Sequence, residues 1–255
     1  MEKMYHIGID GSHGAITALL PGDPGRVEMI ARKLERPRFY SQCREYTTWL
    51  GELRGETVIV MSTGMGGPST AIGVEELYKT GVRDFIRVGT CGGMDLNVCG
   101  GDIVIATGAI RMEGTSKEYV PIEFPAVAHL DVSNALIAAA REKSLTYHAG
   151  IVQCKDSFYG QHDPGRMPAG YELENKWQAW IKARCLASEM ESSALFIVSQ
   201  ILGARAGCVL YAVWNQERGN AGLSNPECHD TGSAVEVAVR AAEILIEDRS
   251  KQNRD

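Results

Sequence analysis

Short apolar runs that alternate with longer segments of helical periodicity constrain the fold of this chain more than any other feature. The runs rich in β-branched and other apolar residues are 15–20, 57–62, 85–88, 103–109, 148–154 and 208–214. Between several of them, apolar residues recur at every third or fourth position, as on one face of a helix, in segments 26–34, 69–79, 132–143, 192–202 and 235–246. Runs that are apolar at nearly every position are typical of central strands covered on both faces. The alternation therefore predicts an α/β fold in which helices cover a sheet.

Composition limits the class of partner. No segment between residues 15 and 246 has the composition of a linker, so we expect the 255 residues to form one domain, 1–255. A formal net charge of −6 disfavours a nucleic-acid or membrane surface and favours small-molecule partners. The first residues lack the apolar region of a secretory signal, and no stretch approaches the roughly 20 apolar residues of a membrane span, so we expect a cytoplasmic protein. The 7 cysteines include no C-x-x-C pair, which disfavours a disulfide framework or a zinc site.

Two glycine-rich segments that each follow an apolar run indicate an anion site. They read PGDPGR at 21–26 and RVGTCGG at 87–93, and we expect both to be turns at the carboxyl ends of strands. Glycine lets backbone N–H groups approach a ligand, a following helix start adds its positive end, and a guanidinium offers a fork of donors that matches phosphate. Neither segment is G-x-G-x-x-G, and TGMGGP at 63–68 lacks the Lys-Ser/Thr of a P-loop. The expected guest is inorganic phosphate or a phosphate monoester.

A pair of carboxylates precedes the helix expected from residue 192. The segment SEMES at 188–192 places Glu189 and Glu191 on either side of Met190. Carboxylates accept hydrogen bonds from vicinal hydroxyls and a thioether offers an apolar surface, so the group suits a ribose. The alternative is a carboxylate pair that is favoured at a helix N-terminus by the helix dipole. Segment 160–170 is polar, has no period and contains prolines and glycines, which predicts a surface loop that could close over the site.

Several motifs in register resemble the nucleoside phosphorylase superfamily, whose members include the uridine phosphorylases and the hexameric purine nucleoside phosphorylases. They are PGDPGR at 21–26, REYTTW at 44–49, STGMGGPS at 62–69, RVGT at 87–90 and EME at 189–191. The resemblance extends from about residue 5 to residue 246. It implies a three-layer fold with a central mixed, twisted sheet flanked by helices, no organic cofactor, and phosphate as a co-substrate.

The resemblance also assigns residues to the two ends of the substrate. The phosphate residues that it implies are Gly22 through its backbone, Arg26, Arg87, Thr90 and, from a neighbouring subunit, Arg44. The ribose residues are Thr90, Glu189, Met190, Glu191 and, across the same interface, His6. Because a neighbour completes each site, the resemblance implies dimers, which the family arranges as hexamers. On residue type alone, Arg44 would be a solvated ion-pair partner and His6 a solvated tail residue.

A monovalent cation such as K⁺ is a further implication of the resemblance. In similar uridine phosphorylases it lies between two subunits, on groups that match Glu45, the Met65 carbonyl and Ser69. The alternatives are an ion-paired Glu45 and a helix-capping Ser69.

The base residues favour a pyrimidine. The segment SFYGQ at 157–161 is similar to the uridine phosphorylase segment in which a Phe packs on the pyrimidine and a Gln bonds its amide edge, which implies Phe158 and Gln161 in the base site, beside Cys91 and Gly92. The family places an Arg two residues after this Gln, whereas HDPGR at 162–166 offers only Arg166. Purine-specific relatives have a Ser-Asp pair after the strand that matches 209–213, and Asn215 in VWNQ cannot act as that acid.

The expected reaction is the reversible phosphorolysis of uridine to uracil and α-ribose 1-phosphate, with inversion at the anomeric carbon. Arg87, Glu191, Gln161 and Arg166 are the residues expected to carry it, and Cys91 is expected to line the site without reacting. The alternatives are a purine nucleoside phosphorylase, a hydrolytic nucleosidase, and a nucleoside-binding relative without activity.

Overall fold

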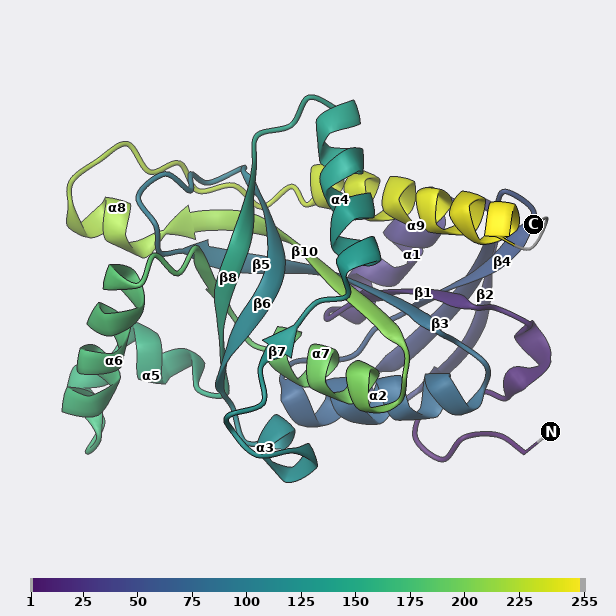
Figure 1. Cartoon of the computed structure of the whole chain (residues 1–255), viewed down its shortest axis with the longest axis horizontal. Coiled ribbons are helices and arrows are strands. Elements are labelled where there is room, and N and C mark those ends of the chain that lie inside the picture. Colours follow the sequence, from purple (N-terminus) through teal and green to yellow (C-terminus); the bar gives the residue numbers. More distant parts are fainter. Residues whose placement is uncertain (1, 253–255) are drawn as a thin grey trace.

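The computed structural model describes residues 2–252, and all strands of that part belong to one mixed sheet (Figure 1). The strands are β1 Thr17–Pro21, β2 Glu35–Cys43, β3 Tyr46–Leu53, β4 Glu56–Met61, β5 Asp84–Gly93, β6 Ile103–Met112, β7 Ala126–Val127, β8 Tyr147–Lys155, β9 Ala187–Glu189 and β10 Arg205–Asn215. Their order across the sheet is β10-β6-β8-β9-β5-β1-β4-β3-β2, and β7 pairs with β6. Residues 1 and 253–255 of the expected domain lie outside the described residues.

Part of this sheet closes on itself. Strand β10 pairs in parallel with β5 and antiparallel with β6, while β8 and β9 connect β6 back to β5. These strands therefore form a ring, from which β1, β4, β3 and β2 extend as an open sheet. The ring brings the ends of β5, β8, β9 and β10 around one opening, although these strands are far apart in the sequence.

Helices cover the two faces of the sheet in separate layers. The helices are α1 Val27–Ala31, α2 Gly67–Lys79, α3 Thr115–Tyr119, α4 Leu130–Glu142, α5 Phe158–His162, α6 Gly170–Lys182, α7 Ser192–Ile201, α8 Gln216–Asn220 and α9 Gly232–Gln252. One core cluster joins the sheet to α2 and α7, and a second joins it to α1, α4 and α9. Figure 1 shows these two layers on opposite sides of the strands, with α5, α6 and α8 gathered at one end. The predicted α/β fold with a mixed sheet and flanking helices is confirmed.

The six apolar runs of the sequence all became strands, for a simple energetic reason. All five residues of β1 are buried, and β4, β5, β6 and β10 are buried along most of their length. Burying such side chains on both faces is favourable by about 25 cal/mol per Å² of apolar surface, which fixes these segments at the centre of the sheet.

Two predictions about loops were wrong. Segment 87–93 is not a turn but the last seven residues of β5, where Gly89 and Gly93 let the side chains of β10 approach closely: a Cβ at Gly93 would lie 2.6 Å from Asn215 Nδ2. Segment 160–170 is not a plain loop. It contains the end of α5, a 3₁₀ turn at Pro164–Arg166 and the first residue of α6. It does lie at the surface, as expected.

Candidate active site

A cavity of about 760 Å³ opens where β1, β4, β5, β8 and β10 end. Most residues that the sequence assigned to phosphate, ribose and base line it together: Gly22, Arg26, Arg87, Thr90, Cys91, Gly92, Phe158, Gln161, Glu189, Met190 and Glu191. It is also lined by residues that sequence reasoning did not single out, namely Lys155, His162, Ser188, Val213 and Trp214. One concave site thus collects chain segments from residue 22 to residue 214.

Two arginines meet at one end of this cavity. Arg87 projects from β5 and is 4% exposed, and Arg26 ends the 3₁₀ turn that follows β1. A Cβ at Gly22 would lie 3.1 Å from the Gly64 carbonyl oxygen and within 4.0 Å of a nitrogen of each guanidinium. Glycine at 22 therefore keeps open the space that both guanidinium groups face.

These guanidinium groups hold buried donors without acceptors. Within residues 2–252, Arg26 Nη1, Arg87 Nη1 and Arg87 Nε have no hydrogen-bond partner. Buried donors are almost always paired, and leaving one unpaired costs about 1–3 kcal/mol. Burial and the neighbouring Arg87 charge lower the pKa of Arg26. Two guanidinium groups that both carry unpaired donors fit an oxyanion that accepts hydrogen bonds from both.

Glu191 ties the arginine end to the middle of the cavity. It is 4% exposed and stands immediately before α7, where its Oε1 accepts from Gly66 N–H at 2.6 Å and its Oε2 pairs with Arg87 Nη2. Burial raises the pKa of the Glu191 carboxyl against the pull of Arg87. Burial opposes charge on Arg87 as well, but Glu191 and Glu189 outweigh it, so the pKa of Arg87 is raised. The pair holds the guanidinium in place and leaves Glu191 lone pairs that can accept from hydroxyls.

Glu189 stabilises the backbone next to Glu191. Its carboxylate accepts from the Glu191 N–H at 2.9 Å, from the Ser192 N–H at 3.0 Å and from the Ser192 hydroxyl. It also lies 3.5 Å from Arg87 Nε. These contacts order the start of α7, as the helix-terminus alternative for this carboxylate anticipated.

A second group of cavity residues forms a chain of polar side chains. Lys155 Nζ donates to Ser188 Oγ at 2.6 Å, and Ser188 Oγ donates to Gln161 Oε1 at 2.7 Å. Lys155 is 6% exposed and Ser188 is 3% exposed. Burial lowers the pKa of Lys155. The sequence signal for this lysine was its place directly after the apolar run 148–154, two positions before the SFYGQ motif.

Aromatic rings form the wall beside Gln161. The Phe158 and His162 rings lie 4.3 Å apart, and His162 stacks on Trp214 with ring centroids 6.3 Å apart. Burial lowers the pKa of His162, as does the Lys155 charge. A flat, apolar surface beside amide and ammonium donors suits a heteroaromatic ring with carbonyl groups.

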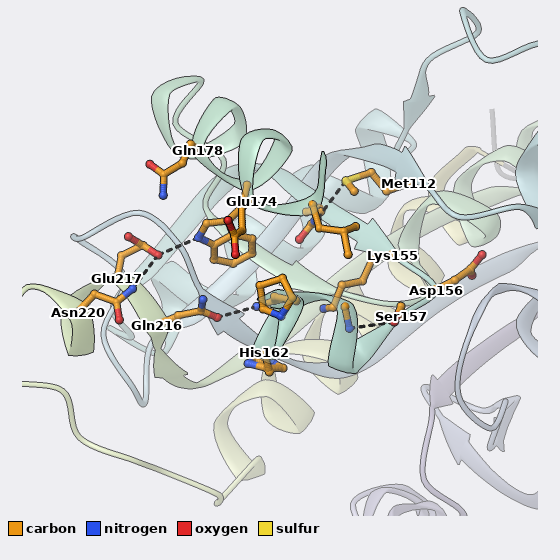
Figure 2. A pocket seen from close by; sticks show the side chains of 16 residues that line it. Met112, Lys155, Asp156, Ser157, His162, Glu174, Gln178, Gln216, Glu217 and Asn220 are labelled. Atoms are coloured by element: carbon orange, nitrogen blue, oxygen red, sulfur yellow. Dashed lines mark hydrogen bonds between the residues drawn. The ribbon is translucent and has the colours of Figure 1, made fainter. Parts of the chain in front are cut away.

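A smaller cavity of about 330 Å³ adjoins this end and shares Lys155, Gln161 and His162 with the larger one. In Figure 2, Lys155 and Ser157 lie on one side of it and Gln216, Glu217 and Asn220 on the other, below α6. Gln161 Nε2 donates to Gln216 Oε1 at 3.2 Å. Gln161 thus stands in the wall between the two cavities, bonded at both ends of its amide.

Three expected site residues lie outside the cavity of this chain. Arg166 is exposed and its Nε lies 3.0 Å from Asp163 Oδ2, so the structure does not bring it to Gln161. Arg44 is exposed in the turn between β2 and β3, with its guanidinium 5.8 Å from the centre of the Tyr5 ring. His6 stacks edge-on against Tyr5 at 4.7 Å, and its Nδ1 lies 2.7 Å from Glu76 Oε1.

Asn215 has a structural role. It is fully buried, and its Nδ2 donates to the carbonyl oxygens of Asp95 at 2.7 Å and Val98 at 2.8 Å. Its Oδ1 accepts from the Arg218 N–H at 3.0 Å. The side chain is therefore committed to holding two loops rather than directed to a ligand.

The groups expected to hold a monovalent cation lie together at the rim. Glu45, Met65 and Ser69 all line the cavity, and Ser69 Oγ donates to the Met65 carbonyl at 3.2 Å. No group of three or more His, Cys, Asp or Glu side chains in residues 2–252 is arranged to hold a metal ion.

None of the helices in the described residues is both long and apolar enough to span a bilayer.

Comparison with known proteins places this site in a family. The model of the phosphorylase superfamily matches residues 17–247. The chain belongs to this superfamily. It is 52% identical over 242 residues to a uridine phosphorylase of Treponema pallidum, covering 95% of this chain and 94% of the relative. It is 42% identical over 247 residues to a uridine phosphorylase of Thermococcus kodakarensis, covering 95% and 87%. A guanosine phosphorylase of Halorubrum lacusprofundi is 37% identical over 246 residues, covering 96% and 98%.

Proposed function

We propose that this chain catalyses the reversible phosphorolysis of uridine, in which inorganic phosphate takes the ribose and uracil leaves. The observation that carries the proposal is the set of unpartnered guanidinium donors on Arg26 and Arg87 at one end of the cavity. A nucleosidase that uses water has no need to hold two buried positive charges together, whereas a phosphorylase must bind an anion there. The relatives from Treponema and Thermococcus carry the name of this activity.

Phosphate is the nucleophile and the protein positions it. Gly22, Arg26, Arg87 and Thr90 surround the place where its oxygens would be held, next to Glu191 and Met190, which would hold the ribose hydroxyls and face. As the glycosidic bond stretches, positive charge grows on the ribose and the phosphate charge stabilises it. Donors that are already aimed at the reacting groups avoid reorganisation, and one such donor can lower the barrier by about 2.7–4 kcal/mol.

The leaving uracil gains negative charge on its carbonyl oxygens, so its end of the cavity needs donors. Gln161 offers an amide N–H, and Lys155 offers ammonium N–H groups beyond the one given to Ser188. We propose that Lys155 supplies the positive charge for which the sequence suggested Arg166. Phe158, His162 and Trp214 would pack on the base.

A neighbouring subunit is proposed to complete each site. Tyr5, His6 and Arg44 form one contact group at the surface, since the Tyr5 ring touches both the His6 ring and the Arg44 guanidinium. Glu76 holds His6 through Nδ1 and leaves Nε2 for another partner. A surface group in which Tyr5 and Arg44 are exposed and His6 is half-buried and held in place suits a role across a dimer interface, and repeated dimers would give the hexamer of similar enzymes.

The domain extent, the cation, the co-substrate, the lid and the cellular location are also proposals. The described residues share one sheet, which supports a single domain over 1–255. A K⁺ ion is proposed at Glu45, the Met65 carbonyl and Ser69, where a carboxylate, a carbonyl and a hydroxyl lie together at the cavity rim. Phosphate is the co-substrate, segment 160–170 is the proposed lid, and the cytoplasm is the proposed location.

The test is a steady-state assay of uridine, thymidine and inosine with and without phosphate. We expect uracil release from uridine that requires phosphate and yields ribose 1-phosphate. Cleavage of inosine without cleavage of uridine would favour a purine nucleoside phosphorylase, and release of free ribose without phosphate would favour a nucleosidase. Binding of uridine with no turnover would indicate a relative that only binds nucleosides.

A further inference from the structure

We propose that Ser188 is a positioning residue that fixes the orientation of the Gln161 amide, and that this orientation lets the site distinguish uracil from cytosine. The proposal rests on the proposed function, because it concerns the pyrimidine end of the same cavity. Ser188 itself was not among the residues expected to bind substrate. It stands on β9, in the cavity wall between Lys155 and Gln161.

The direction of the hydrogen bonds follows from the chemistry of lysine. An ammonium group has three donors and no acceptor, so Lys155 Nζ must donate to Ser188 Oγ. The Ser188 hydroxyl proton then needs an acceptor, because the residue is 3% exposed and a buried donor without a hydrogen-bond partner destabilises the fold. The acceptor within reach is Gln161 Oε1, at 2.7 Å.

The other end of the amide is held as well. Gln161 Nε2 donates to Gln216 Oε1 at 3.2 Å, on the side of the smaller cavity seen in Figure 2. Ser188 thus holds the oxygen of the amide and Gln216 holds its nitrogen. Each contact uses one bonding position and leaves a second lone pair on the oxygen and a second N–H on the nitrogen. The amide can still pair with a base, but in one orientation only.

A fixed amide discriminates because the two pyrimidines present opposite patterns. Uracil offers an N3–H donor between two carbonyl acceptors, which matches an amide that presents an oxygen beside an N–H. Cytosine has an unprotonated N3 acceptor with an amino donor at C4 and a carbonyl at C2. At the edge formed by N3 and the substituent at C4, where uracil presents N3–H and O4, cytosine would match the amide only if the amide turned through half a rotation. That rotation would break both the Ser188 and the Gln216 contacts.

Lys155 reinforces this selection. Lys155 has donors only, so it keeps the Ser188 proton directed at Gln161 Oε1, which is the amide orientation that suits uracil. If Lys155 were replaced by a group without a charge, Ser188 could reverse its hydrogen bond and release the amide. The orientation of Gln161 therefore depends on a chain that ends in a cation.

The test compares Ser188→Ala with Ser188→Thr, which keeps the hydroxyl. Dissociation constants for uridine and cytidine are measured by titration calorimetry without phosphate, alongside kcat and KM for uridine with phosphate. In Ser188→Ala we expect the preference for uridine over cytidine to fall by about tenfold, in keeping with the loss of one hydrogen bond. Ser188→Thr is expected to retain most of the preference.

The outcomes separate positioning from a structural role. A serine that only supports the fold would, on removal, weaken both nucleosides by the same factor, and an unchanged preference in Ser188→Ala would overturn the proposal. If that variant does not fold, Lys155→Met serves instead, since it keeps Ser188 but should lower the preference as well; an unchanged preference there would also overturn it. Failure of the proposed function would appear independently, as a lack of phosphate-dependent uridine cleavage by the unaltered protein.

Discussion

Arg26 and Arg87 are expected to respond differently to the same substitution, because only one of them is held by carboxylates. Arg87 pairs with Glu191 and lies 3.5 Å from Glu189, and all three side chains are buried. Within the described residues, Arg26 makes no ion pair, and its Nη1 has no partner. Replacing each arginine by Met keeps a long side chain and removes the charge.

The expected losses follow from these contacts. A hydrogen bond to a charged group contributes about 1.5–3 kcal/mol, so Arg26→Met should raise the KM for phosphate, or lower kcat/KM, by about 10- to 150-fold. Its free energy of unfolding without phosphate should stay within about 0.5 kcal/mol, since no internal pair is broken. Arg87→Met should lose activity and also about 3–5 kcal/mol of stability, because two buried carboxylates lose their partner.

The assay is phosphate-dependent uracil release, together with urea unfolding with and without phosphate. In the unaltered protein, phosphate at about 100 times its dissociation constant should add about 2.7 kcal/mol to the free energy of unfolding, and Arg26→Met should lose about 1.3–2.4 kcal/mol of this gain. Glu28→Gln on the neighbouring helix, whose carboxylate pairs with Arg32 at the surface, is a matched control that should change neither quantity. An Arg26→Met variant with an unaltered KM for phosphate would refute the anion site.

Two further predictions concern the base end. Asn215→Asp should not confer inosine cleavage. It should lower the free energy of unfolding, measured in urea, by about 3 kcal/mol or more, because a buried carboxylate would face the carbonyl oxygens of Asp95 and Val98. A stable variant that cleaves inosine would contradict this prediction. The pKa of Lys155 is lowered from the ordinary lysine value of 10.5, so Lys155 should lose its proton below that pH. The kcat/KM for uridine should therefore fall as the pH rises toward 10.5, and Lys155→Met should remove this alkaline decrease. The unfolded chain holds this proton more tightly, so the contribution of Lys155 to the free energy of unfolding should rise with pH over the same interval, and a fall would contradict the lowered pKa.

The sequence predicted those parts of the fold that are buried on both faces and missed those that are not. The hairpin strand β2 has no buried residue, so it lacks the apolar signal that marked β1 and β4. Helix α6 buries only Gly170 and Trp177, which leaves no clear apolar stripe. Segment 87–93 was mistaken for a turn because its glycines were interpreted through backbone freedom, whereas they allow close packing of β5 against β10.

The site was predicted where a motif fixes the backbone and missed where the tertiary structure supplies the partner. Gly22, Arg26, Arg87 and Glu191 belong to local patterns that follow strands, and the structure brings them together. Ser188 and Lys155 are 33 positions apart and meet because β8 and β9 are paired. No local spacing in the sequence encodes that contact.

The positive charge proposed for the base end of the cavity comes from strand β8 rather than from the segment in which the family pattern places it. The reaction requires a donor where negative charge develops on the leaving base, and the family pattern made a downstream arginine the natural candidate. In this chain, however, Arg166 pairs with Asp163 at the surface, while Lys155 lies at the buried end of β8 and reaches Gln161 through Ser188. A lysine on a strand is held more rigidly than an arginine on a surface segment, but burial lowers its pKa, so the gain in position brings a sensitivity to alkaline pH. Loss of the alkaline limb in Lys155→Met, together with a loss of uridine preference, would tie both properties to this one side chain.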